Sequence, residues 1–266
     1  MTQIVTGAGS DRAVLVTGGA KRVGAAIVRR FARAGWRCVI HCRSSRAQAD
    51  ALRAELIAQG GAAQVVQFDL AAGAPAVEAG LDAAFQAEPG LRVLVNSASV
   101  FAYDSAAQPS AAVWSEAMAV NALAPILLAA GFAARLATGS DACVVNLLDQ
   151  KLRNPNPDFF SYTVSKAALE AASQMLARAY APRLRVANVA PGLMLPSADQ
   201  TEAEFAQAAT MNLLQRRTEL EELAEAVHFV ATSAFITGQT LYADSGQSLT
   251  AQVRDVLYLV RQQEAP

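Results

Sequence analysis

The 266-residue chain has little charge, few histidines and few cysteines, and each shortage excludes a class of protein. Charged residues make up only 17%, and 22 basic side chains against 23 acidic ones leave a net charge of −1. A nucleic-acid-binding protein needs a basic surplus to neutralise phosphates, and a disordered chain needs high net charge with low hydrophobicity. The 53% of hydrophobic residues instead predict a folded domain with a large core, and their excess leads us to expect a homo-oligomer.

The 3 cysteines and 2 histidines are too few and too scattered to form a metal site. Cys38 and Cys42 lie in an apolar segment with the pattern of a strand, where residues four apart are separated by about 13 Å. Neither a disulfide nor a shared zinc ion spans that distance. We therefore expect buried free thiols, a reducing compartment and no bound metal.

Long uninterrupted apolar segments are also missing. The first twelve residues, MTQIVTGAGSDR, lack the basic start and the apolar stretch of a signal peptide. The most apolar segment, residues 118–134, is interrupted by Asn121 and Pro125, which favours a buried or interfacial helix over a membrane span. The sequence therefore predicts a cytoplasmic protein that binds neither membranes nor nucleic acid.

What the chain does contain is a regular alternation of short β-branched segments and longer Ala-rich segments. Strict alternation of strand and helix predicts parallel strands joined by right-handed crossovers, a doubly wound α/β sheet of about seven strands. We expect one domain over residues 13–249, a leader over 1–12 and a tail over 250–266. The predicted strands are 13–17, 37–41, 64–68, 92–96, 142–148, 185–190 and 240–243, and the predicted helices lie near 24–34, 45–59, 75–87, 110–137, 159–180 and 218–232.

Two segments interrupt the alternation. Residues 193–217 are polar and follow the sixth strand, and ligands of such sheets bind beyond the carboxyl ends of the strands. This segment is therefore a candidate substrate loop or lid. The tail has apolar residues at helical spacing, which fits packing on a neighbouring subunit and equally fits a helix that closes its own sheet.

A glycine-rich turn, TGGAKRVG at residues 17–24, joins the first predicted strand to the first predicted helix. Gly18 suits a tight turn, Gly19 a close approach of backbone to phosphate, and Gly24 close packing of helix on sheet. The N–H groups of the helix N-terminus can then bind a pyrophosphate. Gly24 is followed by alanines, which excludes a nucleoside-triphosphate P-loop, whereas an ordinary strand–helix turn stays open as the alternative. The predicted cofactor contacts of this turn are Gly18, Lys21, Arg22, Val23 and Gly24.

The end of the second strand indicates which dinucleotide binds. A protein that binds NAD carries an acid there for the ribose hydroxyls, whereas an arginine with hydroxyls suits the 2′-phosphate of NADPH. This chain has His41, Arg43 and Ser44 in that region and no acid before Asp50. We therefore predict NADPH, with Arg43 and Ser44 as the phosphate clamp; the alternative is that Arg43 is a solvated loop charge. Asp69 and Leu70, after the third strand, are expected near the adenine.

Tyr162 and Lys166 are four residues apart at the start of a predicted helix, so both side chains lie on one face. An ammonium group beside a phenol lowers the phenol's pKa toward the range of a useful proton donor. The same lysine can hold a nicotinamide ribose. A Tyr/Lys pair is commonly a surface feature, but its place after a fifth strand and downstream of the glycine turn favours a catalytic role.

Over residues 13–247 the chain resembles the short-chain dehydrogenase/reductase family. The matching motifs are TGGAKRVG (17–24), DL (69–70), NSAS (96–99), VNALAP (120–125), YTVSK (162–166) and APG (190–192). The resemblance implies a Rossmann-type fold and a tetramer built through the helices at 110–137 and 159–180. It also implies a catalytic set of Asn121, Tyr162 and Lys166, with Asn121 supporting a water-linked proton path, and cofactor contacts from Asn96, Ala98, Lys166, Pro191 and Gly192.

Two departures from that family resemble its pteridine reductase and dihydromonapterin or dihydrofolate reductase branch. Arg22 stands where the family usually has glycine, and Asp149 stands where it has a catalytic serine, thirteen residues before Tyr162. In that branch an Asp partners the Tyr, and an aromatic residue stacks on the pterin. Ser99 and Phe101 occupy the corresponding substrate positions, so the resemblance implies an NADPH-dependent reductase of a dihydropterin or dihydrofolate-like ring.

The chemistry of the residues agrees with this. A carboxyl group in an apolar pocket has a raised pKa and can deliver a proton to a ring nitrogen, and an aromatic ring can stack on a flat heterocycle. The predicted substrate contacts are therefore Ser99, Phe101, Asp149 and Tyr162, with Tyr103 and Asp104 expected to line the same pocket.

Alternatives remain at each level. Asp149 could instead pair with Lys151 or Arg153, and Phe101 could be ordinary core packing. The rival functions are a short-chain reductase of a small ketone or acyl carbonyl and a non-catalytic NADPH-binding sensor. A serine hydrolase is excluded because the chain has no GxSxG motif.

Overall fold

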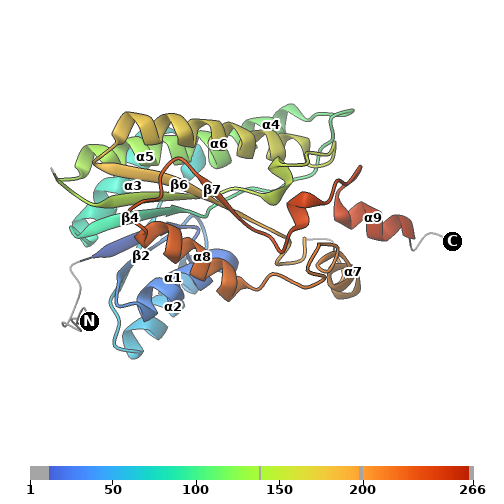
Figure 1. The fold of residues 1–266 in the computed structure, drawn as a ribbon. Helices are drawn as coiled ribbons and strands as arrows, with labels where there is room; N and C mark the ends of the chain where they lie inside the picture. Colours follow the sequence, from blue (N-terminus) through green and yellow to red (C-terminus); the bar gives the residue numbers. More distant parts are fainter. Residues whose placement is uncertain (1–11, 138, 198–199, 264–266) are drawn as a thin grey trace.

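The computed structural model (Figure 1) describes residues 12–137, 139–197 and 200–263, so residues 1–11 of the predicted leader lie outside the described part. Within that part, a sheet of 7 parallel strands has the order β3-β2-β1-β4-β5-β6-β7, which confirms the predicted doubly wound α/β fold. The strands are β1 Ala13–Thr17, β2 Arg37–Cys42, β3 Ala63–Gln67, β4 Leu91–Asn96, β5 Ala142–Leu147, β6 Leu184–Pro191 and β7 Thr240–Ala243.

Helices cover both faces of the sheet (Figure 1): α1, α2 and α8 pack on one face, and α3, α5 and α6 on the other. Because both faces are covered, strands such as β1 and β5 are buried at every position, which is why they appear in the sequence as continuous apolar runs. The α-helices are α1 Arg22–Arg33, α2 Arg46–Ala58, α3 Ala74–Ala87, α4 Ala111–Ala117, α5 Ala124–Arg135, α6 Phe160–Tyr180, α7 Glu202–Ala208, α8 Leu220–Thr232 and α9 Val256–Gln263.

The three cysteines are free and buried, as predicted. Cys38 and Cys42 lie in β2 and Cys143 in β5. Burial in these two strands raises the pKa of Cys38 and of Cys143 to about 12, so both thiols stay protonated and act as small apolar side chains.

The helix predicted at 110–137 is divided into α4, a π-helical segment Met118–Leu123, and α5. By length and apolar composition residues 111–135 could cross a membrane, but 61% of the apolar window is buried inside the fold, as in a core helix. The π-helical turn shifts the phase of the side chains, and such turns are common at functional sites. It carries Asn121.

The candidate substrate loop at 193–217 contains α7, which begins with a capping box between Thr201 and Glu204. The tail ends in α9, which packs on α7 through Val256 and Val260 rather than on the sheet. An ion pair of 2.7 Å between Arg261 and Glu204 joins the two helices. Substrate loop and tail therefore form one unit at the carboxyl edge of the sheet (Figure 1).

Candidate active site

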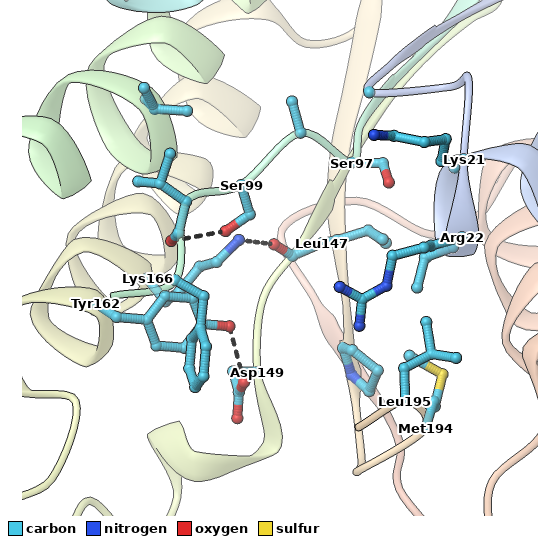
Figure 2. Close-up of a pocket in the computed structure, with 18 of the residues that line it drawn as sticks. Lys21, Arg22, Ser97, Ser99, Leu147, Asp149, Tyr162, Lys166, Met194 and Leu195 are labelled. Carbon is cyan, nitrogen blue, oxygen red and sulfur yellow. Dashed lines mark hydrogen bonds between the residues drawn. The ribbon is translucent and has the colours of Figure 1, made fainter. Parts of the chain in front are cut away.

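A cavity of about 660 Å³ opens at the carboxyl ends of the strands, where ligands of doubly wound sheets bind (Figure 2). Its walls come from the segments that follow β1 to β6, from the first part of the substrate loop and from the tail before α9. Its volume is typical of a small-molecule site. The predicted residues that line it are Gly18, Lys21, Arg22, Val23, Gly24, His41, Arg43, Ser44, Asp69, Leu70, Ala98, Ser99, Phe101, Asp149, Tyr162, Lys166, Pro191 and Gly192.

The glycine turn depends on residues without side chains at two positions. Gly18 has a φ of +62°, and a Cβ on Gly24 would lie 2.2 Å from the carbonyl oxygen of Gly18. Gly19 does not line the cavity, which corrects its expected role at a phosphate. A Cβ there would lie 2.9 Å from the carbonyl oxygen of Val16, so Gly19 permits close packing inside the turn.

Arg22 has a φ of +50°, a left-handed conformation that is rare for residues other than glycine. This backbone geometry explains why the family usually has glycine at this position. The Arg22 side chain crosses the cavity toward the substrate loop (Figure 2) and donates a hydrogen bond of 3.2 Å to the carbonyl oxygen of Pro196. Arg22 thus links the cofactor turn to the substrate loop.

His41 supports the glycine turn with its ring. Nδ1 accepts a hydrogen bond of 3.1 Å from the Gly18 N–H, and Nε2 lies 3.0 Å from the carbonyl oxygen of Phe68. Both bonds are made together only by a neutral ring with its proton on Nε2. Burial lowers the pKa of His41 to about 4 and keeps the ring neutral. His41 therefore positions the turn, and both its nitrogens are used by the protein rather than free for a cofactor.

Arg43 and Ser44 lie exposed on the rim of the cavity just after β2. Arg46, three residues on, is paired with Asp50 at 2.8 Å. The nearest acid after β2 is thus held by an arginine of α2. The Arg43 guanidinium and the Ser44 hydroxyl therefore lie where the 2′-phosphate of NADPH is expected to bind.

Asn96 does not line the cavity, although it was predicted as a cofactor contact. It belongs to a row of polar residues that face one another across five neighbouring strands, and its amide donates to the Asn146 side chain at 2.7 Å. Thr17, in the same row, accepts hydrogen bonds from the N–H groups of Ser97 and Ala98 through its hydroxyl. The row consists of Thr17, Asn96, Asn146, Asn188 and Thr240. It holds the strand ends in register beneath the cavity.

Thr17, Asn146 and Asn188 were missed as contributors to the site. The only sequence signal was the presence of polar residues inside otherwise apolar strands. Their alignment in one row depends on the register between strands, which the sequence of a single strand does not contain.

Asn121 is fully buried in the π-helical segment, and it does not line the cavity either. Its side-chain oxygen accepts hydrogen bonds from the Val100 N–H at 2.8 Å and from the Ser99 hydroxyl at 3.1 Å. Its amide donates to the carbonyl oxygen of Val100 and to the Ser165 hydroxyl. These four bonds fasten the segment after β4 to α6, so Asn121 acts in this structure by positioning Ser99 and its neighbours.

The Tyr162 hydroxyl donates a hydrogen bond of 2.8 Å to a carboxylate oxygen of Asp149 (Figure 2). The other carboxylate oxygen of Asp149 accepts from the Lys151 N–H at 2.9 Å. The predicted alternative of an outer ion pair is wrong, because the Lys151 ammonium donates elsewhere and the Arg153 guanidinium stacks on Tyr242 at 3.9 Å. The Asp149 carboxyl group therefore faces the phenol inside the cavity.

Lys166 does not lower the pKa of Tyr162, which corrects the expectation from their spacing. Its ammonium donates to the carbonyl oxygen of Leu147 at 2.8 Å and lies 5.7 Å from the centre of the Tyr162 ring. Burial lowers the pKa of Lys166 to about 8. Burial also raises the pKa of Tyr162 well above its ordinary value, and the carboxylates of Asp149 and Asp255 raise it further.

Burial raises the pKa of Asp149 as well, although the hydrogen bonds from Lys151 and Tyr162 oppose this. Asp149 and Tyr162 are therefore a coupled pair, in which loss of a proton from one group disfavours loss from the other. Asp149 and Tyr162 therefore hold their protons more tightly than the same groups do in water. The pair is thus suited to giving a proton to a bound molecule.

Phe101 is 47% exposed at the cavity, which excludes the alternative of ordinary core packing. Its ring stacks on Phe159 with 4.2 Å between centres and meets the Tyr162 ring edge-on at 4.7 Å. Tyr103 and Asp104 do not line the cavity, contrary to expectation. Asp104 is buried and accepts hydrogen bonds from Ser161, which hold the first turn of α6 and with it Tyr162.

The sheet topology and the cavity together define the class of protein: a dinucleotide-dependent oxidoreductase built on a Rossmann-type sheet. The model of the short chain dehydrogenase family matches residues 12–207, and the chain belongs to that family.

Related proteins extend this comparison. The NADP complex of FolM alternative dihydrofolate reductase 1 from Brucella suis is 39% identical, with a TM-score of 0.87 over 91% of this chain and 97% of that chain. The Brucella canis protein of the same name, also complexed with NADP, is 38% identical, with a TM-score of 0.84 over 91% of this chain and 96% of that one. Dihydromonapterin reductase from Escherichia coli O6:K15:H31 is 28% identical over 239 residues, which are 89% of this chain and 96% of that enzyme.

Proposed function

We propose that this protein is an NADPH-dependent reductase of a dihydropterin or dihydrofolate-like ring. The observation that carries the proposal is the hydrogen bond of 2.8 Å between Tyr162 and Asp149, inside a cavity that is also lined by the half-exposed ring of Phe101. An acid with a raised pKa suits proton delivery to a ring nitrogen, whereas a ketone oxygen needs only a hydroxyl donor. The names of the related proteins in Brucella and Escherichia coli support the same substrate class.

The residues of the cavity fit a dinucleotide phosphate. The glycine turn leaves no room for a side chain at Gly24, and basic side chains of Lys21, Arg22 and Arg43 surround the start of α1. The free N–H groups at this helix start suit a pyrophosphate, and Arg43 with Ser44 suits a 2′-phosphate. When bound, NADPH supplies the hydride to a ring carbon of the substrate.

The chain's own residues supply the proton. Tyr162 donates its hydroxyl proton to a ring nitrogen, and Asp149, with its raised pKa, returns a proton to the phenolate oxygen. Lys166 lies 5.7 Å from the centre of the Tyr162 ring and is bonded to the carbonyl oxygen of Leu147, so it fastens the end of β5 beside the phenol, and we expect it to hold the nicotinamide ribose. Phe101, which lines the cavity, would stack on the flat ring of the substrate. Hydride and proton together add two hydrogen atoms across a carbon–nitrogen double bond.

This function is tested by mixing the protein with NADPH and dihydromonapterin, dihydrobiopterin or dihydrofolate and following the nicotinamide absorbance. We expect oxidation of NADPH well above background with at least one of the three. No oxidation with any of them contradicts the proposal. Turnover of a panel of small ketones instead would favour a carbonyl reductase, and tight NADPH binding without any turnover would favour a sensor.

Arg43→Ala is expected to weaken NADPH binding about tenfold or more and to leave NADH binding unchanged, because a hydrogen-bonded ion pair with the 2′-phosphate is worth about 1.5–3 kcal/mol. Fluorescence titration with both nucleotides measures the two affinities. Arg46→Ala is the matched control, since Arg46 is also exposed after β2 but is paired with Asp50. Equal losses for both nucleotides, or the same loss in the control, would contradict the predicted clamp.

We also infer that the protein is a cytoplasmic homo-tetramer. Large apolar side chains of Trp114, Leu123 and Met175 are exposed on α4, the π-helical segment and α6, the region predicted to form a helical interface. The buried free thiols agree with a reducing compartment. Light scattering of the purified protein tests the tetramer: the mass of a single chain would contradict it.

A further inference from the structure

A buried carboxylate, Asp104, lies in the loop between β4 and α4, outside the cavity. One of its oxygens accepts a hydrogen bond of 2.9 Å from the Ser161 N–H, and the other accepts from the Ser161 hydroxyl at 2.5 Å and from the Ser110 N–H at 3.2 Å. Burial raises the pKa of Asp104, but the hydrogen bonds from Ser161 and Ser110 outweigh it and lower that pKa below its ordinary value. Asp104 therefore stays charged and is satisfied by donors of the protein.

The start of α6 depends on Asp104 because the preceding residue cannot cap the helix. The first N–H groups of a helix have no partner inside it, and Phe159, the residue before α6, has no polar side chain to accept from them. Instead, the Phe160 N–H donates to the carbonyl oxygen of Asp104 at 3.3 Å, and the Ser161 N–H donates to the Asp104 carboxylate. A residue 57 positions earlier in the chain thus takes the place of an N-cap and puts a negative charge at the positive end of the helix dipole.

The backbone of Phe159 shows how firmly this helix start is held. Its φ of +51° and ψ of +49° are left-handed, a conformation that is rare for residues other than glycine and persists only where the surroundings fix it. The Phe159 ring stacks on Phe101 with 4.2 Å between centres, and the next two N–H groups are bonded to Asp104. A rotation of the first turn of α6 would break these contacts together.

Asp104 also connects the proton donor to the aromatic residue of the cavity. Phe101 lies three residues before Asp104 in the same loop, and Tyr162 directly follows Ser161 in α6. The Phe101 and Tyr162 rings meet edge-on with 4.7 Å between centres. The bond from the Ser110 N–H adds the start of α4, so three segments at the substrate end of the fold meet at one carboxylate.

Resting on the proposed function, we propose that Asp104 is a positioning residue for proton transfer. It holds the first turn of α6 so that the Tyr162 hydroxyl meets Asp149 at 2.8 Å and lies at a fixed place beside Phe101. A displacement of a reacting group by about 1 Å costs on the order of a hundredfold in rate. Loss of Asp104 therefore slows the chemical step, and because Asp104 lies outside the cavity, it leaves the binding of NADPH and dihydropterin nearly unchanged.

The test uses Asp104→Asn and Ser161→Ala, singly and together. The amide keeps the shape but loses the charge and one acceptor oxygen, whereas the alanine removes only the hydroxyl donor. We expect kcat for the dihydropterin to fall about tenfold or more in Asp104→Asn and by a smaller factor in Ser161→Ala, with KM and NADPH affinity within about twofold of the unaltered protein. Because both changes break the same hydrogen bond, the double variant should lose less than the product of the two factors. Single-turnover oxidation of NADPH, steady-state kinetics and fluorescence titration give these quantities.

Ser110→Ala is the matched control. It removes the hydroxyl that caps α4 by accepting from the Val113 N–H at 3.4 Å, but it keeps the backbone N–H that bonds to Asp104. This variant should lower the thermal stability without lowering kcat. If Asp104→Asn does not fold, Ser161→Ala decides by the same measurements.

An unchanged kcat in the Asp104 and Ser161 variants, or a loss of NADPH affinity and a rise in KM as large as the fall in kcat, would overturn the inference while leaving the proposed function standing. Absence of dihydropterin reduction by the unaltered protein would instead count against the proposed function. The same variants, compared on a small ketone that the protein reduces, would then decide whether Asp104 positions Tyr162.

Discussion

Asp149→Ser is expected to lower kcat/KM for the dihydropterin by about a hundredfold or more, the range of effects for loss of a positioned proton donor. Serine has no acidic proton to return to Tyr162, and it leaves the phenol without the carboxylate partner found at 2.8 Å. NADPH binding should stay close to that of the unaltered protein, because Asp149 lies beside Tyr162 and away from Lys21 and Arg22 of the glycine turn (Figure 2). Steady-state kinetics with NADPH and dihydromonapterin, together with nucleotide titration, give both quantities.

Asp149→Asn separates proton delivery from positioning. The amide keeps the shape and can still accept the Tyr162 hydrogen bond, but it carries no titratable proton. We expect kcat/KM for the dihydropterin to fall by the same factor as in Asp149→Ser. We expect the rate of the unaltered protein to decline as the pH rises through the raised pKa of Asp149, and we expect the Asn variant to lack this decline. Full activity of the amide variant would mean that Asp149 only orients Tyr162. Asp69→Asn serves as the control, because it removes a carboxylate of the same cavity that does not touch Tyr162.

Acidification is expected to destabilise the protein through His41. Its pKa is about 4 in the folded state, against an ordinary value of 6.5, so the unfolded chain binds the extra proton first. The stabilisation is fully present above pH 6.5 and is lost as the pH falls from 6.5 through 4. The full difference is roughly 3 kcal/mol in the free energy of unfolding. Protonation also removes the acceptor for the Gly18 N–H, so NADPH affinity should fall over the same range.

Urea unfolding at several pH values, for the unaltered protein and for His41→Gln, measures this effect. The variant should be less stable at neutral pH and should show a weaker dependence on pH between 6.5 and 4. His228→Gln in α8, outside the cavity, is the comparison variant: burial lowers the pKa of His228 as well, so this variant should also weaken the pH dependence of stability but should leave NADPH affinity unchanged. A pH dependence unchanged by His41→Gln would show that other groups account for the acid sensitivity.

The cofactor half of the site could be predicted from the sequence because its determinants are local. A tight turn after a strand needs glycine at fixed offsets, and the helix that follows supplies N–H groups whatever the rest of the chain does. Gly18, Gly24 and Arg43 were therefore found at their positions. Asp149, thirteen residues before Tyr162, was identified through the resemblance to the pteridine reductase branch.

The errors share one cause, which is that each depended on a partner distant in the sequence. The spacing of Tyr162 and Lys166 was read as direct electrostatic contact. In the fold the lysine bonds to the end of β5, and Asp149 dominates the surroundings of the phenol. Asn96 was assigned to the cofactor from a motif, whereas the register of the strands directs its side chain toward Asn146. Asn121 lies in the π-helical turn, and its part in a water-linked proton path stays a prediction. Asp255 carried no motif.

The order of strands and helices, the covered parallel sheet, the phosphate-binding turn and the choice of an acid beside the phenol were all determined by the sequence itself. The first three follow from hydrophobic period or from residues adjacent in the chain, and the acid was identified through the resemblance to the pteridine reductase branch. The tertiary structure alone decided the protonation balance of Asp149, Tyr162 and Lys166, the support of Gly18 by His41, and the closure of the substrate end by the tail. These depend on burial and on contacts between residues far apart in the chain, and neither is contained in the pattern of any one segment.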